Sequence, residues 1–380
     1  MATTQAIVAR APSEPHTVNW SLEEIEVFAP GDGEIFVEMI ATGICHTDLV
    51  LSSVPEGQFG VTYPKIVGHE GAGIVRAVGP NVHSVQLGDP ILLSYYSCSS
   101  CGQCKSSHPA YCDSFAQENY IGQQGRMSIK GSGEKIWSRF FGQSSFARHS
   151  VVSEASVVNV KGILDDQDEL KLFAPLGCGF QTGMGAILNY AAAGLGDAVM
   201  ILGSGAVGMG SLMTAKIQNC TTIIVVDKVE ARLQLARDLG ATHTINTGSL
   251  GSATLKDAVW SIRPGGVSAV IDTTGVPSLL EESFHCTEKR GKFIFIGVPP
   301  YGYDFKFDVT EHINSGRSII GCIEGDCIPG KAIPQMIEWY REGRFPIDKL
   351  IRYFEAEEYQ QALATVMEGS VVKPVLVWMK

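Results

Sequence analysis

One segment constrains the fold of this chain more than any other, because it orders a strand, a glycine-rich turn, a helix and a second strand. Residues 197–246 read DAVMILGSGAVGMGSLMTAKIQNCTTIIVVDKVEARLQLARDLGATHTIN. The apolar run Ala198 to Leu202 predicts a buried strand, a helix follows to about Asn219, and the β-rich run TTIIVVD ends at Asp227. This order indicates a βαβ unit, in which a crossover helix joins two parallel strands.

The glycines of this unit form the pattern G-x-G-x-x-G at Gly203, Gly205 and Gly208. The first permits a tight turn, the second lets a pyrophosphate approach the backbone, and the third allows the helix to pack closely on the strand. Asp227 would accept hydrogen bonds from an adenosine ribose and repel a 2′-phosphate, so NAD is favoured over NADP. Arg232 is a further candidate for cofactor binding. The alternative is a glycine-rich turn in some other α/β protein.

The rest of the chain suggests a second, different domain. Further strand-like runs at 267–275, 291–300 and 318–325 extend the parallel sheet. The first 175 or so residues instead carry short β-rich runs broken by Gly, Pro and Asp, which predict a barrel-like β-rich domain. After about Glu324 the spacing predicts a helix at 333–345 and a final strand at 372–379 that returns to this domain.

Four of the ten cysteines lie within the segment SYYSCSSCGQCKSSHPAYC, residues 94–112. The N-terminus shows no secretory signal and no apolar run reaches about 18 residues, so we expect a soluble cytoplasmic protein. In a reducing compartment, clustered cysteines favour a metal over disulfides. Four thiolates complete a tetrahedral shell, which predicts a structural zinc; the alternatives are surface thiols and a redox-active C-x-x-C pair. The ligands would be Cys98, Cys101, Cys104 and Cys112.

A second, dispersed set of potential ligands comprises Cys45 in TGICHTD, His69 in VGHEGAG and Cys178 in PLGCGFQTG. Two thiolates and one imidazole leave a fourth position open, which is typical of a catalytic zinc. Each residue alone is weak evidence, because a cysteine beside glycine usually fills a core and a lone histidine usually makes a structural hydrogen bond.

Groups that such a site requires accompany these ligands. Asp48 is placed to orient an imidazole, Glu70 adjoins His69 as a supporting carboxylate, and Thr47 offers a hydroxyl for proton transfer. The alternatives are solvated charges for the two acids and a turn hydrogen bond for the threonine.

The net charge of the chain excludes some classes of partner. With 29 basic and 40 acidic side chains, the formal net charge is −11. This disfavours nonspecific attraction to nucleic acid or to an anionic membrane, so we expect no nucleic-acid or membrane partner.

Taken in order, these motifs resemble those of the zinc-dependent medium-chain alcohol dehydrogenases over nearly the whole chain. The motifs are GICHTD, GHEGAG, the four-cysteine segment, GCG, the glycine pattern and GVPP. The segments TGICHTDLV, FFGQSSFA, APLGCGFQTG and IEGD look most like those of aryl (benzyl-type) alcohol dehydrogenases. The resemblance implies an α/β protein with a GroES-like catalytic domain at 1–179, its zinc lobe at about 94–115, a Rossmann domain at 180–323 and a return segment at 324–380.

The resemblance also carries residue roles. It implies two zinc ions per chain, held by the two ligand sets above. It implies that His46 lies near the cofactor pyrophosphate, that Thr182 contacts the nicotinamide side, and that Lys373 helps to bind a cofactor phosphate. Two positions depart from the family, since many members have histidine at Val50, where it ends a proton path, and arginine at His46. These departures put the proton route beyond Thr47 in doubt.

The function expected from the sequence is reversible hydride transfer between NAD and a primary, aromatic or allylic alcohol or its aldehyde. One alternative is a biosynthetic reductase of a conjugated carbonyl or iminium substrate, and another is a noncatalytic, oligomeric NAD-binding protein. The resemblance and the apolar run GKFIFIGVPP, if it forms a sheet edge, suggest a homodimer or homotetramer through the Rossmann domains. A buried central strand would explain that run equally well.

Overall fold

The structure is a computed structural model that describes residues 2–14 and 16–378. Met379, which belongs to the predicted final strand, lies outside the described residues, as do Met1, Pro15 and Lys380. The chain forms two compact units. The first comprises Met1–Cys178, Ile328–Glu338 and Ile347–Lys380, and the second comprises Gly179–Cys327 and Trp339–Pro346.

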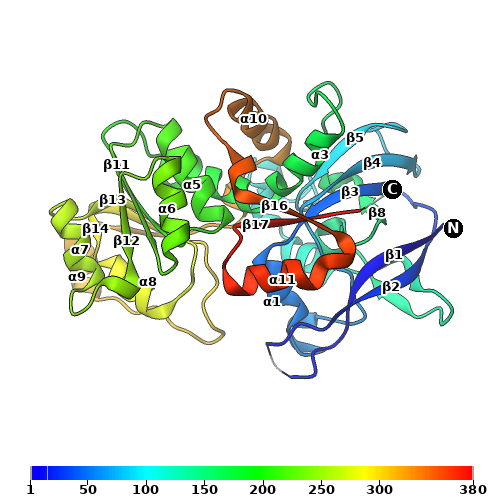
Figure 1. Cartoon of the computed structure of the whole chain (residues 1–380), viewed down its shortest axis with the longest axis horizontal. Coiled ribbons are helices and arrows are strands. Elements are labelled where there is room, and N and C mark those ends of the chain that lie inside the picture. The colour runs from blue at the N-terminus through cyan, green and yellow to red at the C-terminus, as the bar shows by residue number, and fades with distance from the viewer. Residues whose placement is uncertain (1, 15, 379–380) are drawn as a thin grey trace. The chain divides into compact units, whose positions relative to one another are not determined.

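The second unit contains a six-stranded sheet in which every neighbouring pair is parallel (Figure 1). Its order is β12-β11-β10-β13-β14-β15, which is the doubly wound order of Rossmann folds and confirms the predicted fold class. The strands are β10 (Ala198–Leu202), β11 (Thr222–Asp227), β12 (His243–Asn246), β13 (Val267–Asp272), β14 (Thr287–Phe295) and β15 (Ser318–Gly321).

Helices alternate with these strands along the chain. They are α4 (Gly179–Gly185), α5 (Ala206–Ile217), α6 (Glu230–Leu239), α7 (Leu255–Ile262), α8 (Pro277–Phe284) and α9 (Val309–Ser315). All five residues of β10 are buried, because parallel strands between two helical layers have no face exposed to water. This explains why the sequence AVMIL shows no alternation of apolar and polar residues.

Strand β14 lies inside the sheet, hydrogen-bonded to β13 on one side and β15 on the other. The interpretation of GKFIFIGVPP as an apolar sheet edge is therefore wrong, and the alternative of a central strand is correct. Phe293 and Ile294 are apolar because both are fully buried. The outer strand on this side of the described sheet is the shorter β15.

The first unit is built on two sheets. One has the antiparallel order β1-β2-β6-β7, and the other has the order β16-β17-β3-β4-β5-β9 with β8 also paired to β3. The strands are β1 (Ala2–Ala9), β2 (Trp20–Val27), β3 (Glu34–Gly43), β4 (Gly71–Val78), β5 (Pro90–Leu93), β6 (Gln124–Ile129), β7 (Lys135–Trp137), β8 (His149–Ser153), β9 (Val157–Asn159), β16 (Ile351–Glu355) and β17 (Lys373–Val377).

The remaining α-helices are short or lie late in the chain. They are α1 (His46–Ser52), α2 (Gly102–Lys105), α3 (Asp168–Phe173), α10 (Pro329–Arg341) and α11 (Tyr359–Glu368). Strand β17 pairs antiparallel with the end of β3, where Val375 faces Gly43, and Figure 1 shows the red β17 beside the blue β3. The last strand of the chain therefore lies beside the segment that leads into Cys45.

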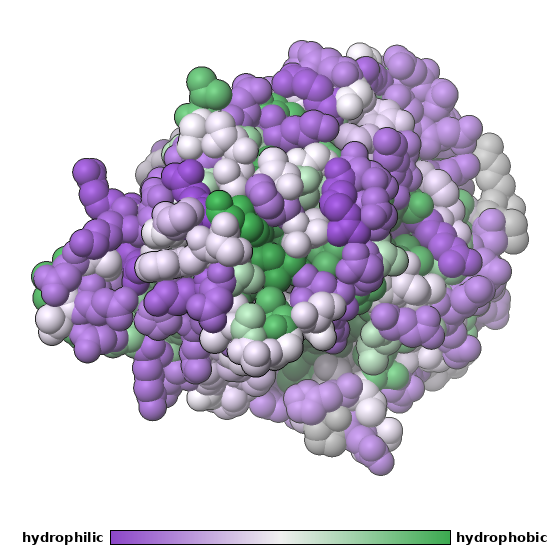
Figure 2. Space-filling view, turned by 60° about the vertical axis from the view of Figure 1, so that its left-hand side comes forward, coloured by the Kyte–Doolittle hydropathy of each residue, from purple (hydrophilic) through white to green (hydrophobic). Residues whose placement is uncertain are grey.

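The surface is mainly polar on the face drawn in Figure 2, where hydrophobic residues appear as small groups between hydrophilic ones. Among the described residues, no helix combines the length and the apolar character that crossing a membrane requires.

Candidate functional site

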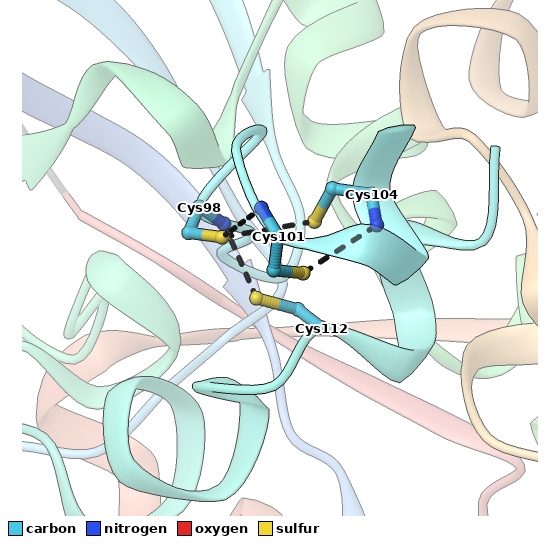
Figure 3. A group of neighbouring side chains, drawn as sticks. All are labelled: Cys98, Cys101, Cys104 and Cys112. Atoms are coloured by element: carbon cyan, nitrogen blue, oxygen red, sulfur yellow. Dashed lines mark hydrogen bonds between the residues drawn. The ribbon is translucent and has the colours of Figure 1, made fainter. Parts of the chain in front are cut away.

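The four-cysteine segment brings its four cysteine side chains together, as Figure 3 shows. The thiols of Cys98, Cys101, Cys104 and Cys112 all lie within 4.8 Å of one another. Backbone N–H groups turn toward them: Cys101 donates to the Sγ of Cys98 at 3.3 Å, and Cys98 donates to the Sγ of Cys112 at 3.3 Å. The Sγ atoms of Cys98 and Cys104 are 3.9 Å apart. A tetrahedral zinc with Zn–S bonds of about 2.3 Å separates its sulfurs by about 3.8 Å, so the group fits this ion.

The four thiols of this group differ in their pKa values. All ten cysteines are free thiols. A hydrogen bond from the Ser100 hydroxyl lowers the pKa of Cys98 to about 6, so this sulfur is a thiolate at neutral pH. Burial instead raises the pKa of Cys104 to about 12 and also raises that of Cys112, so these two thiols would lose their protons when a metal binds. Thiolate is the form that binds zinc.

The dispersed residues converge at a second point of the first unit. Cys45 is the N-cap of α1, His69 precedes β4, and Cys178 follows a short 3₁₀ helix at Ala174–Gly177. Their donor atoms and a carboxylate oxygen of Glu70 lie within 4.8 Å of one another. The Nε2 of His69 is 3.3 Å from the Sγ of Cys178, although 109 residues separate them in sequence. Two sulfurs and one nitrogen at this spacing fit a zinc ion.

Asp48 fixes the orientation of the imidazole. Its Oδ1 lies 2.8 Å from the Nδ1 of His69 and also accepts from the N–H of Gly68 at 2.9 Å. Its Oδ2 accepts from the N–H of Cys45 at 2.9 Å. With Nδ1 donating to the carboxylate, the lone pair of Nε2 is left for a metal.

The electrostatics of this cluster favour an added cation. The hydrogen bond with Cys178 is the main reason that the pKa of Cys45 is well below its usual range. Burial by itself would lower the pKa of His69, but the charges of Asp48 and Cys45 raise it well above its usual value. The lowered pKa makes Cys45 a thiolate, the form that binds zinc. The raised pKa of His69 reflects the negative charge around its ring, which a bound divalent ion would also neutralise.

Two phenylalanines pack against the same imidazole, which sequence reasoning missed. The ring of Phe141 stacks on His69 with centroids 4.3 Å apart, and Phe140 meets it edge-on at 5.5 Å. Phe141 has a φ of 53°, an unusual left-handed conformation for a bulky side chain. Strained backbone of this kind concentrates at functional sites, but the local sequence gives no sign of it.

Glu70 is buried and forms an ion pair that the sequence did not reveal. The ammonium of Lys373 on β17 donates to both of its carboxylate oxygens, at 2.8 and 2.7 Å, and to the carbonyl oxygen of Ile44 at 3.1 Å. Burial raises the pKa of Glu70, and Lys373 opposes that rise. The N–H groups of Lys373 are directed at the oxygens of Glu70 and Ile44. Its role toward a cofactor phosphate therefore stays a prediction.

The other predicted residues of this region lie on α1. The Oγ1 of Thr47 is half-buried and 3.8 Å from the Sγ of Cys45. His46 and Val50 are exposed on the same helix. Thr47 is therefore the hydroxyl that this helix brings next to the metal ligands.

The glycine-rich turn has the geometry that its sequence pattern predicts. Gly203 has a φ of 89°, and a Cβ on Gly208 would lie 1.9 Å from the carbonyl oxygen of Gly203. A Cβ on Gly205 would meet no atom within 4 Å, so the backbone there faces open space that a phosphate could occupy. Thr182 is buried on α4 of the same unit.

Asp227 ends β11, as predicted, and contacts the glycine-rich turn. Its Oδ2 accepts from the N–H of Ser204 at 2.8 Å and from the Ser204 hydroxyl. Its Oδ1 accepts from the N–H groups of Lys228 and Val229 at 2.7 and 2.9 Å. Arg232 lies on α6, where burial lowers its pKa and the charge of Asp227 opposes the shift.

Comparison with known proteins gives consistent matches along the whole chain. Residues 31–162 match the family model described as alcohol dehydrogenase GroES-like domain, and residues 206–342 match that described as zinc-binding dehydrogenase. The chain is 34% identical over 377 residues to geraniol dehydrogenase of Castellaniella defragrans, covering 98% of this chain and 97% of that protein.

Two solved structures also resemble it. A crystal structure titled alcohol dehydrogenase zinc-binding domain protein, from Burkholderia ambifaria, has a TM-score of 0.91 and 38% identity. Benzyl alcohol dehydrogenase from Acinetobacter calcoaceticus has a TM-score of 0.90 and 33% identity. Each comparison covers 100% of both chains.

Proposed function

The chain belongs to the zinc-dependent medium-chain alcohol dehydrogenases, oxidoreductases that act on alcohols, and on this premise we propose that it oxidises a primary aromatic or allylic alcohol to its aldehyde, reversibly, with NAD. The observation that carries the proposal is the convergence of Cys45, His69 and Cys178. The similar proteins named for benzyl alcohol and geraniol support the substrate class, because both compounds carry the CH₂OH group on an unsaturated carbon.

Each metal would be held by one of the two ligand sets. Cys45, His69 and Cys178 would bind the catalytic zinc beside Glu70, and the four cysteines of the zinc lobe would bind the structural zinc. When bound, the catalytic zinc supplies a Lewis acid that lowers the pKa of the alcohol, and NAD supplies the hydride acceptor.

The chain itself would hold the ligands and move the proton. Asp48 accepts from the Nδ1 of His69 and so directs Nε2 toward the two cysteines, where a bound metal would take the place of a proton. Thr47 would accept the alcohol proton in oxidation and return it in reduction, because its hydroxyl lies beside Cys45. Val50, exposed on the same helix, cannot continue that path, so the proton would leave through water or His46.

The second unit would bind NAD along the glycine-rich turn. The pyrophosphate would approach Gly205. Asp227 would accept hydrogen bonds from the ribose hydroxyls in place of those that it now accepts from Ser204. Its charge disfavours NADP. The cofactor-binding residues proposed in this unit are Thr182, Gly203, Gly205, Gly208, Asp227 and Arg232. His46 and Lys373 belong to the first unit, and their roles toward the cofactor stay predictions.

Assembly and location belong to the same proposal. We infer a homodimer or homotetramer, and the short outer strand β15 is a candidate contact. The two groups of cysteines that could hold a metal would need a reducing compartment, and we propose the cytoplasm.

The test is NADH formation by purified protein with benzyl alcohol, cinnamyl alcohol, geraniol and straight-chain primary alcohols. We expect kcat/KM to be highest for the aromatic and allylic alcohols. Cys45→Ser should abolish turnover, whereas Cys220→Ser, a buried cysteine outside both ligand sets, should not. Reduction of conjugated carbonyls without alcohol oxidation would favour the reductase, and NAD binding without any turnover would favour the noncatalytic protein.

A further inference from the structure

The segment FFGQSSFA, residues 140–147, has no role in the chemistry proposed above, although it is buried throughout. Its largest uncharged polar side chain is Gln143, which has no exposed surface. A buried amide requires hydrogen-bond partners, so its contacts indicate what the segment does.

Gln143 joins two strands that flank the metal ligands. Its Nε2 donates to the carbonyl oxygen of His69 at 2.9 Å and to that of Ser94 at 2.9 Å. Its Oε1 accepts from the N–H of Gly71 at 3.1 Å. One side chain therefore holds the backbone on both sides of Glu70 and ties it to the residue that follows β5.

Ser94 continues this connection to the second ligand. Its hydroxyl donates to the carbonyl oxygen of Gly177 at 2.6 Å, directly before Cys178. The two backbones are also in close contact, because a Cβ on Gly177 would lie 1.9 Å from the carbonyl oxygen of Leu93. Any side chain at residue 177 would push Cys178 away from β5.

These contacts form one buried path from the backbone of His69 through Gln143 and Ser94 to the backbone before Cys178. We propose that Gln143 and Ser94 are positioning residues that fix the separation of His69 and Cys178, and with it the coordination geometry of the metal. This inference rests on the proposed function, which makes those two residues metal ligands. Asp48 orients the His69 ring, whereas the Gln143–Ser94 path places its backbone, so the two devices are separate.

The path is testable with cobalt, whose absorption bands report coordination geometry. Each protein is loaded with Co²⁺, and the spectrum of its Cys45→Ser derivative is subtracted, which removes the contribution of the four-cysteine site. We expect Gln143→Met and Ser94→Ala to shift and weaken the Cys45-dependent bands. We also expect both to speed cobalt release to a chelator, by about 10–100-fold, as is typical when residues that support a ligand are changed.

The control is Thr365→Val, which removes another buried hydroxyl hydrogen bond of the first unit, from Thr365 to the carbonyl oxygen of Ala362 at 2.7 Å. It should lower the melting temperature without changing the cobalt bands. The double variant Gln143→Met/Ser94→Ala should release cobalt no faster than the faster single variant, because both act on one path.

If Gln143→Met does not fold, Ser94→Ala alone decides the matter. Bands and release rates of Ser94→Ala equal to those of Thr365→Val would overturn the inference while leaving the proposed function intact. If the wild-type protein lacks Cys45-dependent cobalt bands, the proposed function itself is contradicted, and the inference is lost with it.

Discussion

The Nδ1 of His69 lies 2.8 Å from the Oδ1 of Asp48, and neither side chain has any exposed surface. The same carboxylate accepts from the backbone of Cys45, so a single acid supports two of the proposed metal ligands. A buried carboxylate without such partners would lower the stability of the fold. The contacts of Asp48 therefore stabilise the folded chain as well as orienting the proposed ligands.

Replacing Asp48 with asparagine should weaken metal binding at this site. The neutral amide can still accept a hydrogen bond from the N–H of Cys45, but it carries no charge to stabilise the imidazole of His69. We therefore expect the affinity for the metal to fall by about 10–100-fold. Competition with a chelator measures this. Asp257→Asn, which changes a carboxylate in the exposed capping box of α7, should leave the affinity unchanged. Equal affinities of Asp48→Asn and wild type would show that the carboxylate does not support the ligand.

Replacing Thr47 with valine should slow turnover without removing the metal. The variant keeps the shape of the side chain but loses the hydroxyl beside Cys45, so kcat should fall by roughly 10²–10⁴. Steady-state kinetics with benzyl or cinnamyl alcohol, alongside zinc content, separates the two effects. Near-wild-type turnover by Thr47→Val would contradict the proton-transfer role.

Lys65 should make stability depend on pH. Its side chain is buried, with Nζ 4.8 Å from the ring centroid of Phe140, and burial lowers its pKa from 10.5 to about 7. Between these values the unfolded chain binds a proton that the folded protein does not. Stability therefore rises with pH across this window and is lost as pH falls toward 7, by at most roughly 5 kcal/mol.

The measurement for Lys65 is the melting temperature at pH 7 and pH 9. Wild-type protein should lose more stability than Lys65→Met on going from pH 9 to pH 7. Lys130→Met, which removes an exposed lysine paired with Glu24, should follow the wild type. Parallel pH dependence in wild type and Lys65→Met would show that Lys65 is not responsible.

Replacing Asp227 with glycine should change the cofactor preference. The variant removes the ribose acceptor and the charge that repels a 2′-phosphate, so the NAD/NADP ratio of kcat/KM should fall by about tenfold or more. Asp227→Asn keeps an acceptor for Ser204 and should give a smaller change. A wild-type preference for NADP would contradict the assignment.

The parts of the structure that the sequence predicts well are local. Gly203 and Gly208 are required by the backbone of a single turn, and the four cysteines of the zinc lobe lie within fifteen residues, so spacing alone reveals both groups. The parallel sheet likewise follows from apolar runs that are buried on both faces.

The parts that the sequence does not predict depend on contacts across long separations. Lys373 meets Glu70 across 303 residues, and Gln143 meets His69 across 74. No local pattern encodes such a pair, because the partner is set by how β17 and the 140–147 segment pack. The interior position of β14 was ambiguous for the same reason, since a run of apolar residues does not specify its neighbours.

The zinc content of catalytically active protein tests the central claim most directly. Elemental analysis should give two zinc ions per wild-type chain and about one in Cys45→Ser, which should stay folded because the four-cysteine site is intact. Cys101→Ser should instead unfold or aggregate. Active wild-type protein that contains no zinc would contradict both metal sites and the mechanism that depends on them.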